Sequence, residues 1–167
     1  MWNMLKNAFL AMCVLLSMAV VSCEKPEVYN RETQLKLDVD SITRFLKANN
    51  IAAMKDDSGL FSQVLLPGSG NITLEPKDRI TVTYTGRLLN GVVVERLETP
   101  DSLLYSGAIK GWRLGLKKIQ PGGRIRLIIP SSLAYTNRRV GIIPPNSNLD
   151  YTIDLIKVTK YIDPKTK

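Results

Sequence analysis

One stretch decides the fold class of this chain: Arg79-Ile-Thr-Val-Thr-Tyr-Thr-Gly-Arg-Leu-Leu-Asn-Gly-Val92. Apolar side chains alternate with threonines along it, which is typical of a β-strand with one buried face. The dipeptide Asn90-Gly91 favours a tight hairpin turn, because both residues readily adopt positive φ. We therefore expect a strand over residues 79–89, a turn, and a partner strand over residues 92–97. The apolar face of the first strand carries Ile80, Val82 and Tyr84.

Three further segments also show one apolar face, and each is predicted to be a strand. They are residues 60–66, 123–129 and 149–155. A short amphipathic helix is predicted after Ser106, a good helix N-cap, while residues 98–105 are predicted to be irregular. The fold class is therefore α+β, a curved antiparallel β-sheet wrapped on one short α-helix. The apolar face of that helix carries Ala108, Ile109, Trp112, Leu116 and Ile119.

Two details of these segments predict contacts between them. Gly111 and Gly115 lie four residues apart in the short helix and weaken it, which indicates that another element packs closely there. The alternating strands also predict ion pairs across the sheet. The acidic residues are Asp150 and Asp154, and the basic residues are Arg124 and Arg126.

A second amphipathic helix is predicted ahead of the sheet, over residues 32–49. Leu35, Val39, Ile42 and Leu46 recur at intervals of four, three and four, which places them on one helical face. Nothing on this helix indicates chemistry. We expect it either to pack on the body of the protein or to pair with a second copy of the chain as a homodimer.

The composition excludes several classes of chemistry. The chain has 167 residues, a formal net charge of +8, no histidine, and two cysteines, Cys13 and Cys23. Catalysis by Ser-His or Cys-His pairs and histidine ligation of a metal are therefore excluded, as is a cysteine-rich zinc site in the body of the chain. The basic residues form no single stripe, so nucleic-acid binding is not predicted. No cofactor and no metal are expected.

Residues 1–22 are predicted to be a signal peptide of the lipoprotein type. The apolar run from Ala8 to Val21 is too short for a comfortable membrane span. It ends at Ser22-Cys23, where the sequence resembles a bacterial lipobox. Cys23 is therefore predicted to carry acyl chains that anchor the protein to a membrane of the bacterial cell envelope. The alternative is an ordinary cleavable signal, or an N-terminal anchor with an incidental cysteine. The segments that follow are a tether (23–31), a helical extension (32–58), the sheet domain (59–160) and a tail (161–167).

Several separated motifs of the sheet domain resemble those of the FKBP-type peptidyl-prolyl cis-trans isomerases. Their order and approximate spacing agree over residues 60–160, and the helix at 32–49 resembles the N-terminal extension of bacterial lipoprotein members of this family. The resemblance implies an FKBP-like fold and a cleft that binds proline-containing polypeptide segments. The motifs are Val82-Thr-Tyr-Thr-Gly86, Asn90-Gly91, Ala108-Ile-Lys-Gly-Trp112, Ala134-Tyr135 and Gly141-Ile-Ile-Pro-Pro145.

The resemblance also implies a role for individual residues. Trp112 would form the floor of the cleft, and Tyr84, Val94 and Tyr151 would form its walls. The Ile109 amide and the Tyr135 hydroxyl would donate to substrate carbonyls, Ile142 and Ile143 would overhang the rim, and Glu95 would orient the site. The residues implied to be catalytic are Tyr84, Glu95 and Tyr135, and those implied to contact substrate are Val94, Ala108, Ile109, Trp112, Ile142, Ile143 and Tyr151.

Prolyl isomerisation fits a chain without histidine. The barrier to rotation, roughly 18–20 kcal/mol, comes from amide resonance. The twisted transition state has lost that resonance and is less dipolar, so an apolar pocket favours it without any acid, base, nucleophile or metal.

The sequence departs from the family pattern at three places. Val94 and Glu95 stand where the family usually has phenylalanine and aspartate, and the segment 96–102 that follows is shortened. Thr136 stands where the family usually has glycine, in a loop that is usually slightly longer. The alternative to a membrane-tethered isomerase that assists the folding of exported proteins is therefore an FKBP-like binding or structural lipoprotein of an envelope assembly.

Overall fold

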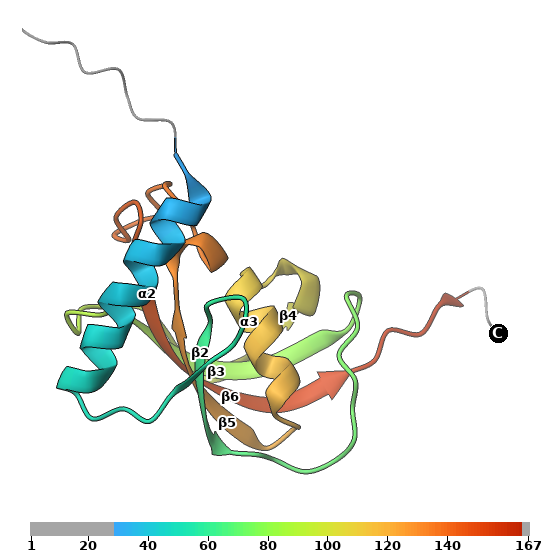
Figure 1. Ribbon diagram of the computed structural model, residues 1–167. Helices are drawn as coiled ribbons and strands as arrows, with labels where there is room; N and C mark the ends of the chain where they lie inside the picture. The colour runs from blue at the N-terminus through green and yellow to red at the C-terminus, as the bar shows by residue number, and fades with distance from the viewer. Residues whose placement is uncertain (1–28, 165–167) are drawn as a thin grey trace, which may run out of the picture.

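The computed structural model describes residues 29–164 and contains a six-stranded antiparallel sheet, with strand order β1-β2-β5-β6-β3-β4 (Figure 1). The two longest central strands, β3 and β6, pair over their whole length. The α+β class predicted from the sequence is confirmed. The strands are β1 (Met54–Lys55), β2 (Phe61–Leu66), β3 (Arg79–Leu88), β4 (Val93–Leu104), β5 (Gly123–Ile129) and β6 (Leu149–Thr159).

The short helix α3 (Lys110–Gly115) lies against β5, and the sheet curves around it (Figure 1). A Cβ atom added to Gly111 would lie 2.5 Å from the side chain of Ile129, and one added to Gly115 would overlap Leu127. Both glycines are therefore needed for the helix to approach the strand, as the sequence predicted. Trp112 from this helix and Leu116 directly after it project into the main core, and burying such a side chain contributes about 1.5–3 kcal/mol.

The structure corrects two local expectations. Ser106 does not cap α3: it lies in a preceding 3₁₀ turn, η1 (Tyr105–Gly107), and the helix begins after Ile109 without a side-chain cap. Residues 98–104 are not irregular but belong to β4. Between the pairs Val82–Asp101 and Tyr84–Leu97 the register shifts, so β4 carries extra residues there. Pro100 lies in this bulge of an edge strand, where a missing N–H donor is tolerated.

Helix α2 (Arg31–Ala48) covers the opposite face of the sheet. The side chain of Asn30 caps its N-terminus by accepting from the amides of Glu32 and Thr33, both at 3.0 Å. Ile42 and Leu46 pack against Phe61 and Ile128 in a second apolar cluster. Because Ile128 alternates along β5 with residues of the main core, this cluster lies on the other side of the sheet. The expected packing of this helix on the body of the protein is thus observed.

The predicted ion pairs across β5 and β6 are present. Arg124 contacts Asp154 and Arg126 contacts Asp150, each at 2.6 Å. Arg126 and Asp150 form two parallel hydrogen bonds, and Asp150 is buried, so this pair also fixes the register of the two strands.

The N-terminal predictions concern residues outside the described range. The predicted signal peptide, Cys23 and most of the predicted tether precede residue 29. Among residues 29–164, no helix is long and apolar enough to cross a membrane.

Candidate prolyl-binding site

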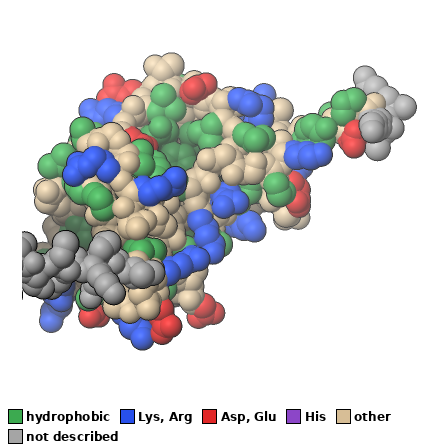
Figure 2. Space-filling view, turned by 90° about the horizontal axis from the view of Figure 1, so that it is seen from above, with side chains coloured by type: hydrophobic (Ala, Val, Ile, Leu, Met, Phe, Trp, Pro, Cys, Tyr) green, Lys and Arg blue, Asp and Glu red, His purple; other side chains and the backbone are tan. Residues whose placement is uncertain are grey.

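A cavity of about 220 Å³ opens between β4, α3 and the loop that follows β5. Hydrophobic side chains gather in a hollow on the face that Figure 2 shows, with Lys and Arg side chains around it. We call the cavity between β4, α3 and the loop after β5 the aromatic cavity, since four of its lining side chains are aromatic. Its lining residues are Tyr84, Glu95, Leu103, Gly107, Ala108, Ile109, Trp112, Tyr135 and Tyr151.

The floor of the cavity is built from three packed aromatic rings. The ring of Trp112 meets those of Tyr84 and Tyr151 edge-on, with centroids 4.8 Å and 5.2 Å apart. Such edge-to-face packing holds the rings in fixed orientations. Tyr151 lies directly over Gly86, where a Cβ atom would overlap its ring. A glycine is therefore needed at position 86, at the end of the Val82–Gly86 motif, so that the Tyr151 ring can pack there.

One carboxylate connects two of the tyrosines. The hydroxyls of Tyr135 and Tyr151 donate to the two oxygens of Glu95 at 3.0 Å and 2.8 Å. Burial, and then the charge of Glu95, raise the pKa of Tyr135 to about 12 and also raise the pKa of Tyr151. Both hydroxyls therefore stay protonated at neutral pH and remain hydrogen-bond donors.

The amide of Ile109 is the other donor that the sequence singled out. Ile109 is the N-cap of α3, a position whose N–H has no partner within the helix. Among the described residues, this amide donates no hydrogen bond to a backbone carbonyl. Because Ile109 also lines the cavity, its N–H is a candidate donor to a ligand there.

The structure brings together seven of the ten predicted site residues. The exceptions are Val94, Ile142 and Ile143, which do not line the cavity. Val94 packs against the main core instead. Two hydrogen bonds between Val140 and Ile143 close a tight turn that turns Ile143 inward, so it is 2% exposed and does not overhang the rim. Ile142, at 61% exposure, projects outward.

Two lining residues were missed by the sequence reasoning, Leu103 and Gly107. Leu103 pairs with Ile80 in the regular part of β4. It was missed because Pro100 led us to expect an irregular segment there. The residues between Leu97 and Leu103 show no apolar alternation, so no local signal in the sequence marked this part of the strand.

Comparison with known proteins places this chain in a family. Residues 70–156 match the model of the family described as FKBP-type peptidyl-prolyl cis-trans isomerase. FkpA of Escherichia coli K12 is 39% identical over 104 residues, which cover 60% of this chain and 38% of that protein. FkpA of Buchnera aphidicola subsp. Baizongia pistaciae is 35% identical over 154 residues, which cover 86% and 60%. The chain therefore spans less than two thirds of the length of these curated relatives.

Two solved structures are similar as well. The crystal structure of FkpA from Escherichia coli superposes with a TM-score of 0.63 at 31% identity, covering 77% of this chain and 63% of that one. A peptidyl-prolyl cis-trans isomerase from Pseudomonas syringae pv. tomato gives 0.64 at 28% identity, covering 78% and 97%. The chain belongs to the FKBP-type peptidyl-prolyl cis-trans isomerase family, which confirms the family and fold predicted from its sequence.

Proposed function

We propose that this protein catalyses cis–trans isomerisation of X-Pro bonds in exported polypeptides while anchored to the bacterial cell envelope through lipid on Cys23. The observation that carries the activity is the aromatic cavity, which is lined by Trp112 and by Ile109, whose amide donates to no backbone carbonyl among the described residues. A prolyl ring fits an apolar, concave surface with few polar groups at its edge. The family resemblance supports the same assignment.

In the proposed mechanism, the cavity surrounds the X-Pro bond with an environment that is less polar than water. The prolyl ring rests on Trp112, and the Ile109 amide donates to a substrate carbonyl and fixes its orientation. The part of the chain preceding proline is then free to rotate. Because the twisted amide is less dipolar than the planar one, exclusion of water favours the transition state over the ground state.

Glu95 supports this mechanism indirectly. Its two bonds hold the rings of Tyr135 and Tyr151 against the cavity. The Tyr135 hydroxyl donates to Glu95. To donate to a substrate carbonyl instead, this hydroxyl must give up its hydrogen bond to Glu95. The same contact favours the alternative, a cavity that binds prolyl segments without accelerating their rotation.

A protease-coupled assay with a proline-containing peptide tests the activity. We expect the full chain to accelerate isomerisation, and Trp112→Leu to lower kcat/KM by about 10- to 100-fold, because about 1–3 kcal/mol of apolar contact is lost. Tyr135→Phe, which keeps the ring and removes the bond to Glu95, should lower it less. Absence of acceleration by the wild-type chain, with retained peptide binding, would favour the binding function.

Mass spectrometry of the N-terminus tests the anchor separately. We expect the mature protein to begin at an acylated Cys23, and Cys23→Ser to release it from the membrane fraction. An unmodified Cys23 in the membrane fraction would contradict lipid anchoring and leave the isomerase proposal untouched.

A further inference from the structure

Helix α2 carries a buried carboxylate that reaches the segment leading to the aromatic cavity. Asp38 is 2% exposed. Its Oδ2 accepts from the backbone amide of Ser131 at 2.9 Å and from the Ser131 hydroxyl at 2.7 Å, and its Oδ1 accepts from the side-chain amide of Gln34 at 2.8 Å. A buried carboxylate is costly unless it is well hydrogen-bonded, so these bonds define where Ser131 lies.

The backbone carbonyl of Ser131 holds the backbone around Tyr135. The Ser131 carbonyl accepts from the amides of Ala134 at 3.0 Å and of Thr136 at 2.8 Å. These are the two amides that flank Tyr135. Hydrogen bonds therefore link α2 through Ser131 to the two neighbours of Tyr135, whose own hydroxyl donates to Glu95.

The backbone after Tyr135 needs such support. Thr136 has a φ of 57°, a left-handed conformation that is strained for a β-branched residue. Besides the bond to Ser131, its carbonyl accepts from the Asn146 amide at 2.8 Å. A strained conformation persists only where the surroundings fix it, so loosening Ser131 should let this turn relax and move the Tyr135 ring.

We propose that Asp38 is a positioning residue for the prolyl site: from the N-terminal helix, it holds Ser131 and thereby places Tyr135 against Glu95. This inference rests on the proposed isomerase function and adds a role for α2 within it. Asp38 does not line the cavity, and its hydrogen bonds among the described residues are to Ser131 and Gln34.

The chain offers two matched pairs of variants for the test. Asp38→Ala removes the buried carboxylate, and Asp40→Ala removes an exposed one from the same helix. Ser131→Ala removes a hydroxyl bonded to Asp38, and Ser132→Ala removes a buried hydroxyl that has no hydrogen-bond partner among the described residues. Each control makes the same chemical change beside the residue it controls.

We expect Asp38→Ala to lower kcat/KM of the full chain about tenfold, mainly through kcat, since small displacements of a site residue have large effects on rate. Ser131→Ala should lower it less, because the Ser131 amide keeps its bond to Asp38. Asp40→Ala and Ser132→Ala should stay within about twofold of wild type. Asp38→Asn, which retains an acceptor oxygen for Ser131, should recover most of the activity.

Amide hydrogen exchange gives a readout that does not depend on catalysis. Asp38→Ala should accelerate exchange at Ala134 and Thr136, whereas Leu46→Ala, which weakens the apolar packing of α2, should leave these two amides protected while the protein is folded. Equal losses of activity in Asp38→Ala and Leu46→Ala, with unchanged exchange at both amides, would overturn the proposal. A wild-type chain without activity would instead contradict the isomerase function, while the exchange result would still decide whether Asp38 holds the Tyr135 turn.

Discussion

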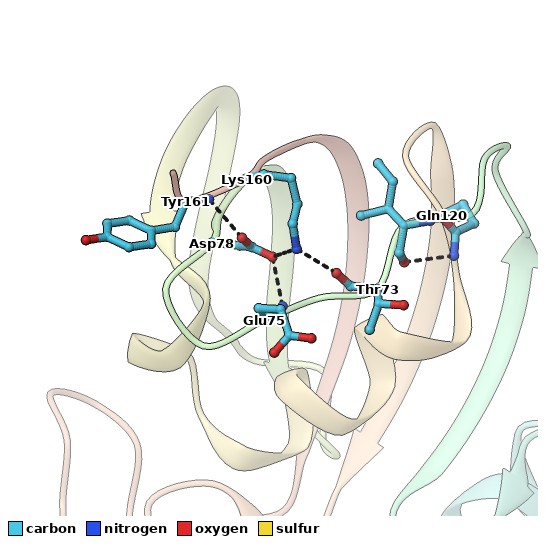
Figure 3. A network of polar contacts seen from close by, with 7 residues as sticks. Thr73, Glu75, Asp78, Gln120, Lys160 and Tyr161 are labelled. Atoms are coloured by element: carbon cyan, nitrogen blue, oxygen red, sulfur yellow. Dashed lines mark hydrogen bonds and ion pairs between the residues drawn. The ribbon is translucent and has the colours of Figure 1, made fainter. Parts of the chain in front are cut away.

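Two buried aspartates hold different sides of the aromatic cavity, and they do so with different partners. Asp78 accepts from the Lys160 ammonium at 2.6 Å and from the amides of Glu75 and Tyr161 at 2.8 Å and 3.0 Å. Figure 3 shows these groups converging on Asp78 from the preceding loop and from the C-terminal segment. Asp38, by contrast, accepts only from neutral groups among the described residues.

The two aspartates also act on different parts of the site. The backbone carbonyl of Asp78 accepts from the Tyr105 amide at 2.9 Å, which fixes the start of η1; Gly107 at the end of this turn and Ala108 after it line the cavity. Asp38 fixes the turn that carries Tyr135. The charged pair of Asp78 and Lys160 joins the C-terminal segment to the fold. The hydrogen bonds of Asp38, all from neutral groups among the described residues, hold the turn that orients Tyr135. The first should matter more for stability and the second more for rate.

The largest expected effect is on stability, from Asp78→Ala. It removes a buried carboxylate and leaves two backbone amides without their acceptor, so we expect the free energy of unfolding to fall by about 3 kcal/mol. Urea denaturation followed by tryptophan fluorescence measures this. Asp57→Ala, at an exposed aspartate, should change it by less than about 0.5 kcal/mol. Equal effects of the two changes would show that the Asp78 network does not hold the fold.

Asp38→Ala should lower stability less, by about 1–2 kcal/mol, because no cation loses its partner and the Ser131 amide also lies 3.2 Å from the Asn148 side chain. The same denaturation measurement applies, with Asp40→Ala as the control. A loss as large as that of Asp78→Ala would contradict the proposed division between stability and rate.

The pH dependence distinguishes the two aspartates further. Burial alone would raise the pKa of Asp78, but Lys160 and the two backbone amides outweigh burial and lower the pKa from its ordinary value of 3.8. The folded pKa is thus below the unfolded one, so the stabilisation is complete above pH about 4 and is lost as the pH falls through the folded value. We expect the stability difference between wild type and Asp78→Asn to be constant from pH 7 to about 5 and to shrink below about 4. A stability difference between wild type and Asp78→Asn that widens as the pH falls would contradict this prediction.

The smallest expected effect concerns the turn held by Asp38. At the positive φ of Thr136, glycine lacks the steric conflict of a Cβ atom. We therefore expect Thr136→Gly to be about 1 kcal/mol more stable than Thr136→Ala, since both lack the threonine hydroxyl and differ only in the Cβ atom. Thermal denaturation of the two variants tests this. Equal stability would mean that the turn relaxes freely, which would weaken the case for Asp38.

Prediction from sequence succeeded where a pattern was local. The alternation along residues 79–88 and the Asn90-Gly91 turn predicted the β3–β4 hairpin, and Gly111 and Gly115 predicted the close approach of α3 to β5. It failed at residues 98–104, where Pro100 indicates irregular structure but lies in a bulge of an edge strand. Ser106 likewise has the chemistry of a helix cap, yet the chain places it in a 3₁₀ turn.

Asp38 shows how a polar residue can be overlooked. It lies three residues after Leu35 and four before Ile42, on the apolar face of α2. That spacing was a signal that Asp38 is buried, but its partner Ser131 is 93 positions away, and no local pattern links the two. Burial can be inferred from helical period, whereas the identity of a distant partner cannot.

The sequence by itself determined β2, β3, β5, β6 and the first part of β4, the two helices, the exclusion of histidine chemistry and the family, because each depends on residue type or on short-range periodicity. Only the tertiary structure decided which side chains meet. Glu95, Tyr135 and Tyr151 come from three separate segments, and Glu95 joins the two hydroxyls only because β3 pairs with both β4 and β6. The same packing buried Ile143, exposed Ile142 and brought Asp38 to Ser131, because contacts between distant segments follow from the packing of whole elements.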